Sequence, residues 1–126
     1  MVEYGILGPL TCHDDGQAVE LGGSRTRAVL AILLLERDRV VSADRLIELV
    51  WGEDPPPTAE TALQGHVSRL RRILGRWAIE TRPPGYLLRA EPGAVDAERF
   101  ASLVDRARAA SPSDAGGMLR EALALW

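Results

Sequence analysis

The sequence has little of what defines several common protein classes. Cys12 is its single cysteine, so no disulfide can form within the chain, which suits a reducing cytosol. No apolar run reaches the roughly 18–20 residues that a helix needs to cross a bilayer. The N-terminus also lacks the positive start of a signal peptide. We therefore expect a cytoplasmic protein with no membrane partner.

Residues that would support catalysis or metal binding are also scarce. The pair Cys12-His13 has no second pair to complete a zinc site, and the other histidine, His66, lies far along the chain. The segment 22–24 (Gly-Gly-Ser) resembles an anion site, but it lacks the Gly-Lys-Ser/Thr ending of a P-loop, and a helix cap explains it better. No serine, histidine and aspartate form a recognisable set. We expect a protein that is not an enzyme and needs no cofactor or metal.

Lysine and asparagine are absent, so all 15 basic residues are arginine. This bias indicates a GC-rich genome, although a preference for bidentate phosphate contacts would produce it too. The net charge of −3 is an average over unlike segments. Residues 58–89 carry six arginines and two acids, whereas residues 1–57 and 90–126 are both net acidic. A polyanion responds to charge within about 8–10 Å, so this basic segment is the one that matters for nucleic acid.

The periodicity of apolar residues predicts an α+β fold. Short antiparallel strands come first, then three helices, a β-hairpin, a short linker and two more helices. The expected ranges are 1–22 for the strands, 25–37, 43–51 and 59–75 for the first helices, 79–89 for the hairpin, and 96–110 and 114–126 for the last helices. Ser24, Ser42 and Thr58 are the expected N-caps.

The helix expected over residues 59–75 has two unlike faces. Its apolar stripe consists of Ala59, Leu63, Val67, Leu70 and Leu74. The opposite side carries small and hydrogen-bonding residues, namely Thr61, Gln64, Gly65, Ser68, Arg69 and Arg72. Arginine can bond guanine bidentately and glutamine can bond adenine, as in a helix that lies in a DNA major groove. A solvated amphipathic helix is the alternative, but such helices mix charges, and no acid occurs between residues 61 and 79.

The predicted hairpin adds to this interpretation. Arg82 immediately precedes a Pro-Pro-Gly turn, from which its side chain can reach a phosphate or a narrow minor groove. An ordinary exposed arginine in a turn remains the alternative. Two helices, the second of them basic, followed by a hairpin are typical of a helix-turn-helix with a wing.

Several stretches together resemble one family. The stretches "ILGPL", "LGGSRTRAVLAILLLERDRVVSADRLIELVWGEDPPPTAETALQGHVSRLRRILG" and "ETRPPGYLL" resemble the N-terminal half of the Streptomyces antibiotic regulatory protein family. Residues 1–91 would be its OmpR-like winged-helix domain. The stretches "VDAERFASLVDRARAA" and "LREALALW", within residues 95–126, resemble the first helices of its tetratricopeptide-like bacterial transcriptional activation domain. Since family members continue further, the resemblance implies a truncated chain.

The resemblance also implies a function. Such proteins activate biosynthetic gene clusters by binding double-stranded DNA at direct repeats near the −35 element, often as side-by-side homodimers. Carried over to this chain, the base readers are Gln64, Ser68, Arg69 and Arg72, with Arg71 and Arg82 on the DNA backbone or minor groove. Thr61 belongs to the same DNA-binding surface. His66 is expected to pack or to donate to a phosphate.

The loop between the two helices would face the RNA polymerase holoenzyme, and it consists of Glu53, Asp54, Pro55, Pro56 and Pro57. A stiff connector is the alternative role for this loop. The chain departs from OmpR-like response regulators in having no room for a receiver domain, and from many family members in carrying Gly65. A protein-interaction module whose working surface is residues 96–126 is the competing function, and salt-dependent DNA binding would distinguish the two.

Overall fold

The computed structural model describes all residues from 1 to 126, and it has the expected α+β composition. Contacts between residues divide the chain into two compact units. One unit comprises residues 20–90, and the other combines residues 1–19 with residues 91–126. Each is described by itself.

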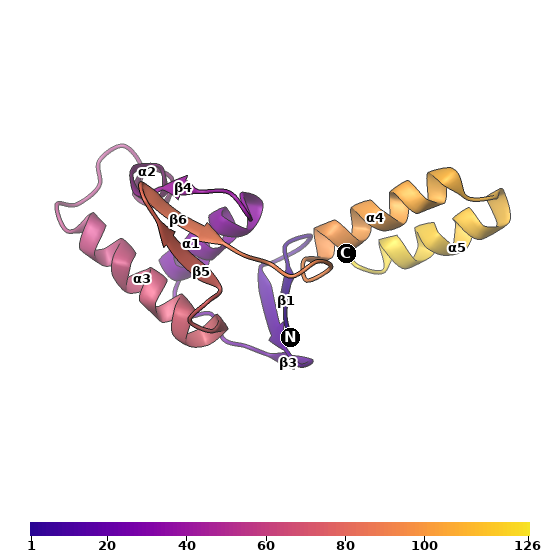
Figure 1. Ribbon diagram of the computed structural model, residues 1–126, viewed down its shortest axis with the longest axis horizontal. Helices are drawn as coiled ribbons and strands as arrows, with labels where there is room; N and C mark the ends of the chain where they lie inside the picture. Colours follow the sequence, from indigo (N-terminus) through magenta and orange to yellow (C-terminus); the bar gives the residue numbers. More distant parts are fainter. The chain divides into compact units, whose positions relative to one another are not determined.

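The unit of residues 20–90 contains three helices and a three-stranded sheet (Figure 1). In chain order its elements are α1 (Ser24–Leu35), β4 (Val41–Ser42), α2 (Ala43–Trp51), α3 (Ala59–Leu74), β5 (Ile79–Arg82) and β6 (Gly85–Leu88). The strands are antiparallel in the order β4-β6-β5, so the short strand β4 extends the C-terminal hairpin. The three expected helices and the expected hairpin are therefore confirmed.

The core of this unit is built from aliphatic side chains of every element. Leu30, Leu33, Leu46, Leu70 and Leu88 are each fully buried. Helices α1 and α3 supply most of the core, through the buried residues of segment 29–34 of α1 and the apolar stripe of α3. Burial of a leucine side chain contributes about 1.5–3 kcal/mol, so these residues fix the relative positions of the helices and the hairpin.

The helix boundaries follow from local chemistry. Ser42 caps α2 as expected, because its side chain accepts a hydrogen bond from the Arg45 backbone nitrogen at 3.1 Å. Gly52 ends that helix with a φ of +85°, a conformation open to glycine. The expected cap at Ser24 is wrong, because Ser24 is the first residue of α1 and Gly23 precedes it without a side-chain hydrogen bond. Thr58 holds the N-cap position of α3, also without a side-chain bond.

Gly85 permits the close approach of β6 to β4. A side chain at this position would overlap the carbonyl oxygen of Val41, which belongs to the neighbouring strand. The backbone nitrogen of Ala43 also donates to the carbonyl of Pro84 at 3.1 Å. The tip of the hairpin is thus seated against the start of α2.

The second unit joins the two ends of the chain. Its strands are β1 (Val2–Gly5), β2 (Thr11–Asp14) and β3 (Gln17–Ala18), which form an antiparallel sheet in that order. The Tyr4 backbone nitrogen donates to the Ala94 carbonyl at 2.7 Å, and the Asp96 carboxylate accepts from the Ile6 nitrogen at 2.8 Å. These bonds explain why residues 1–19 group with the C-terminal segment. The assignment of residues 1–91 to one functional domain stays a prediction.

The same unit contains the two further helices that the sequence predicts, α4 (Asp96–Ala109) and α5 (Pro112–Leu123), which pack against each other as an antiparallel pair (Figure 1). Leu103, Ala107 and Ala122 are buried between them. Phe100 and Trp126 meet edge to face, with ring centroids 5.7 Å apart. The tetratricopeptide-like character of this pair stays a prediction. None of the helices in the chain combines the length and apolar character needed to cross a membrane.

Candidate nucleic-acid interface

Helix α3 presents one buried and one exposed face. The buried residues are those of the predicted stripe: Ala59, Leu63, Val67, Leu70 and Leu74. The opposite face is exposed and consists of Thr61, Gln64, Gly65, Ser68, Arg69 and Arg72. Because the stripe is anchored in the core, the direction in which the polar face points is fixed by packing.

The charges on α3 are separated along its axis. Its one acidic residue, Glu60, lies in the first turn, whereas Arg71 and Arg72 lie in the last turn. Both placements are favourable for the helix dipole. The exposed face beyond the first turn is therefore positive, with no carboxylate from α3 itself to neutralise it.

Arg72 is the arginine best placed to meet a ligand. It is exposed, and its guanidinium makes no hydrogen bond or ion pair within the protein. Gln64 lies exposed on the same face, two turns earlier. Both side chains keep their full hydrogen-bonding capacity for an external partner.

Arg69 is exposed, but its guanidinium contacts a partly buried polar cluster at the junction of α1 and α3. The hydroxyl of Thr26, a fully buried residue of α1, accepts from Arg69 Nη1 at 3.4 Å and lies 2.8 Å from His66 Nδ1. The His66 ring also lies 6.0 Å from the ring of Trp51. Burial, and then the neighbouring Arg69 and Arg25, lower the pKa of His66. The ring is therefore a packing residue in its neutral form, and its role as a phosphate donor stays a prediction.

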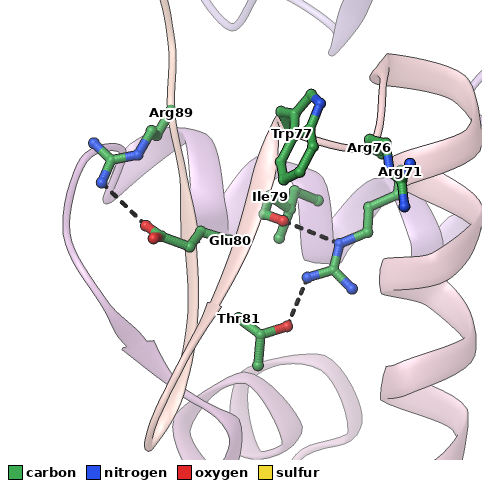
Figure 2. Close-up of a pocket in the computed structure, with 7 residues that line it drawn as sticks. All are labelled: Arg71, Arg76, Trp77, Ile79, Glu80, Thr81 and Arg89. Atoms are coloured by element: carbon green, nitrogen blue, oxygen red, sulfur yellow. Dashed lines mark hydrogen bonds and ion pairs between the residues drawn. The ribbon is translucent and has the colours of Figure 1, made fainter.

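Two arginines that the sequence assigns to DNA also have partners within the protein. Arg71 donates from Nε to the Ile79 carbonyl at 3.0 Å and from Nη2 to the Thr81 hydroxyl at 2.7 Å, which ties α3 to β5 (Figure 2). Arg82 pairs with Glu80 at 3.1 Å. The i, i+2 spacing of Glu80 and Arg82 on one strand could have revealed this pair, since such residues share a face.

Glu80 also pairs with Arg89, which directly follows β6, at 3.0 Å. Glu80 is thus shared by two arginines, and neither ion pair is buried. Exposed pairs of this kind are worth little, about 0–1 kcal/mol, so either arginine can exchange its partner for a phosphate.

The loop between α2 and α3 is fully exposed over Glu53, Asp54, Pro55, Pro56 and Pro57. Part of it borders a recess of about 410 Å³, here named the acidic recess, whose lining residues are Asp44, Ile47, Glu48, Gly52, Glu53 and Pro55. The recess holds three carboxylates and no basic residue.

A second recess, here named the basic recess, opens between the last turn of α3 and the hairpin (Figure 2). Its volume is about 600 Å³, and the residues that give it its character are Arg71, Arg76, Trp77, Glu80 and Arg89. Trp77 is 82% exposed, and the Arg76 guanidinium lies 5.3 Å from its ring centroid. Sequence reasoning missed this feature, because it assigned Trp77 neither to a helix nor to a strand.

Metal binding and thiol chemistry find little support in the structure. No three side chains of histidine, cysteine, aspartate or glutamate gather as they would around a metal ion. Cys12 is buried, and that burial, followed by the charge of Asp14, raises the pKa of its thiol to about 11. The thiol therefore stays protonated and unreactive at neutral pH.

Comparisons with known proteins agree with this geometry. The family described as "Transcriptional regulatory protein, C terminal" matches residues 16–88. Regulatory protein AfsR of Streptomyces coelicolor is 38% identical over 99% of this chain, which spans 13% of AfsR. The motif-based resemblance to the antibiotic regulatory family is thereby confirmed.

Solved structures show the same fold. EmbR of Mycobacterium tuberculosis, in complex with a low-affinity phosphopeptide, matches with a TM-score of 0.92 and 36% identity, covering 99% of this chain and 36% of EmbR. The DNA-binding domain of CpxR from E. coli matches with a TM-score of 0.53 and 31% identity, covering 64% of this chain and 82% of that domain. AfsR and EmbR are regulatory proteins, and the CpxR structure is a DNA-binding domain. The chain belongs to the family of transcriptional regulatory protein C-terminal domains, and it carries the DNA-binding domain of a transcriptional regulator.

Proposed function

We propose that this chain is the sequence-specific DNA-binding part of a transcriptional activator, in which α3 enters the major groove and the β5–β6 hairpin acts as a wing. The observation that carries the proposal is the exposed face of α3. It combines unpaired arginine and glutamine with small residues, on a helix whose other face is locked into the core. Gly65 has open space around it, so it lets the backbone approach a partner closely.

The residues take different roles in this proposal. Thr61, Gln64, Ser68, Arg69 and Arg72 face base edges, where hydrogen bonds distinguish one sequence from another. Arg71 and Arg82 contact the sugar-phosphate backbone or minor groove, because both sit where the hairpin flanks the helix. Their partners inside the protein pre-position their side chains, which reduces the entropy lost on binding.

The finer parts of the proposal concern the promoter. Directly repeated sites near the −35 element would hold two copies side by side and place the loop from Glu53 to Pro57 against RNA polymerase. Three consecutive prolines make this loop stiff, and Glu53 and Asp54 give it negative charge. A stiff, exposed, acidic surface suits a basic partner that must be met in one orientation.

The central experiment selects preferred sites from random duplexes with this chain and then measures binding to the selected and scrambled duplexes at two salt concentrations. A sequence reader should prefer the selected duplex, and its affinity should fall steeply with salt, because phosphate contacts release counterions. Equal binding to both duplexes would refute sequence-specific recognition.

Variants then separate base readers from backbone contacts. Arg72→Ala breaks no bond within the protein, and we expect it to cost about 1–3 kcal/mol on the selected duplex and to relax preference at one base step. Arg82→Ala leaves Glu80 paired with Arg89, and it should weaken binding to both duplexes more evenly. Arg39→Ala, at an exposed arginine outside the interface, is the matched control. Unchanged affinity and preference in Arg72→Ala would show that the reading face is misplaced.

One observation supports a second candidate, a protein-interaction module. Leu123 and Trp126 are 66% and 67% exposed at the end of the α4–α5 pair, so an apolar surface is open there. In that case binding to duplex DNA would show neither sequence preference nor steep salt dependence, and the same isotherms decide between the two functions.

A further inference from the structure

The two recesses of the 20–90 unit are complementary in charge. Three guanidiniums and one carboxylate surround the basic recess, whereas three carboxylates and no basic group surround the acidic recess. We propose that the basic recess of one copy of this chain receives the acidic recess of the next copy when both lie on directly repeated DNA sites, which leaves the loop from Glu53 to Pro57 of the first copy open to the polymerase. This inference rests on the proposed function.

The basic recess has the residue types of an interaction centre. Trp77 projects into solvent with most of its indole uncovered, and Arg76 stacks on it without any carboxylate partner in its own chain. Tryptophan and arginine together dominate the binding energy of protein interfaces, because each combines a large contact area with a polar group. An exposed indole flanked by guanidiniums therefore fits an acidic surface that also offers apolar contacts.

The acidic recess offers both negative charge and apolar contacts. Its lining includes the apolar residues Ile47 and Pro55, against which an indole can pack. Asp44, Glu48 and Glu53 stand around it, and none of them forms an ion pair within the chain. The unpaired carboxylates of one copy can thus meet the unpaired guanidinium of Arg76 of another, with Trp77 between Ile47 and Pro55.

The positions of the two recesses favour a head-to-tail contact. The loop that borders the acidic recess leads directly into Ala59, the first residue of α3, whereas Arg71 is in the last turn and Arg76 lies just beyond. The 16 residues of α3 separate these ends by about 24 Å. Copies on direct repeats have the same orientation, so they must touch through two different surfaces. A two-fold symmetric pair would instead place the same self-complementary surface of both copies together, which copies in one orientation cannot do.

The test compares two duplexes, one with a single selected site and one with two directly repeated sites about 10–11 base pairs apart, one helical turn. The measured quantity is cooperativity, the ratio of second-copy to first-copy affinity. Arg76→Glu and Glu48→Arg should each lower this ratio by about tenfold, in the middle of the range for groups in direct contact. The double variant Arg76→Glu with Glu48→Arg should regain most of it, because the pair is restored with its charges exchanged.

Controls separate this contact from a general loss of charge. Arg39→Glu removes the same charge from an exposed site outside both recesses and should leave the ratio unchanged. Trp77→Ala should lower the ratio without changing single-site affinity. No cooperativity in the unmodified chain, or no recovery in the double variant, would overturn the proposed contact. Absence of specific single-site binding would overturn the proposed function instead, and it is visible separately in the single-site duplex.

Discussion

The unit of residues 20–90 and the α4–α5 pair bury their apolar residues to different extents. In the first, most large apolar side chains are buried in a shared core, although Leu35 and Leu49 are 70% and 54% exposed, and what α3 exposes is polar. In the second, Leu119, Leu123 and Trp126 are 43%, 66% and 67% exposed. The difference is one of geometry, since three helices around a sheet enclose a core whereas two helices bury only the line along which they touch.

This contrast separates two kinds of surface. The apolar residues of α3 are already buried in the core, so the exposed face of the helix is polar. The side chains on that face are available for hydrogen bonding to a partner. The exposed apolar residues of α5 still have hydrophobic surface to bury. The two surfaces therefore call for partners of different chemistry.

The largest expected effect is on the free energy of unfolding, when a buried leucine is compared with an exposed one. Leu70→Ala should lower the free energy of unfolding by about 2–5 kcal/mol, because it leaves a cavity in a sealed core. Leu123→Ala should change it by less than about 0.5 kcal/mol, since its side chain is mostly in water. Denaturant unfolding followed by circular dichroism measures both. Equal losses would mean that the α4–α5 pair is covered in solution, and the contrast would fail.

Two glycines of the 20–90 unit allow a closely packed position to be compared with an open one. Gly85→Ala should destabilise by about 1–3 kcal/mol, because the added methyl group meets the backbone of β4. Gly65→Ala, on the open face of α3, should stabilise by about 0.5–1 kcal/mol through helix propensity. Thermal unfolding of the two variants should shift in opposite directions. A stable Gly85→Ala variant would show that the hairpin is not seated as described.

The smallest expected effect is a pH dependence at His66. Its lowered pKa means that the unfolded chain binds a proton more readily than the folded one, so stability should fall as pH drops below the ordinary histidine value of about 6.5. His66→Gln should flatten this part of the profile. Urea unfolding at several pH values between 5 and 8 provides the comparison. An unchanged profile in His66→Gln would place the titrating group elsewhere.

The sequence predicts the elements of this fold well because their signals are local. The stripe from Ala59 to Leu74 repeats at helical spacing, and the turn before Tyr86 is marked by Pro-Pro-Gly, so α3 and the hairpin could be placed without coordinates. The polar face of α3 follows directly, since a buried stripe determines which residues lie opposite to it.

What the sequence could not predict are the features that depend on distant residues. Arg71 bonds to β5, and Thr26 on α1 bonds to His66 on α3, 40 residues away. The same holds for the pairing of β1 with residues 94–95, which joins the two ends of the chain. The cap expected at Ser24 failed for a local reason instead, because Gly23 already has the extended backbone that precedes a helix.

The two bonds from Arg71 to β5 and the seating of Gly85 against β4 leave no hinge between α3 and the hairpin. A helix and a wing that move as one body span a fixed distance across the double helix. If α3 lies in the major groove, Arg82 can reach its target only where the neighbouring minor groove has the matching width and path. Duplexes too stiff to adopt that shape should then bind more weakly even when they carry the preferred bases. A rigid protein of this kind discriminates between duplexes by their flexibility as well as by their sequence.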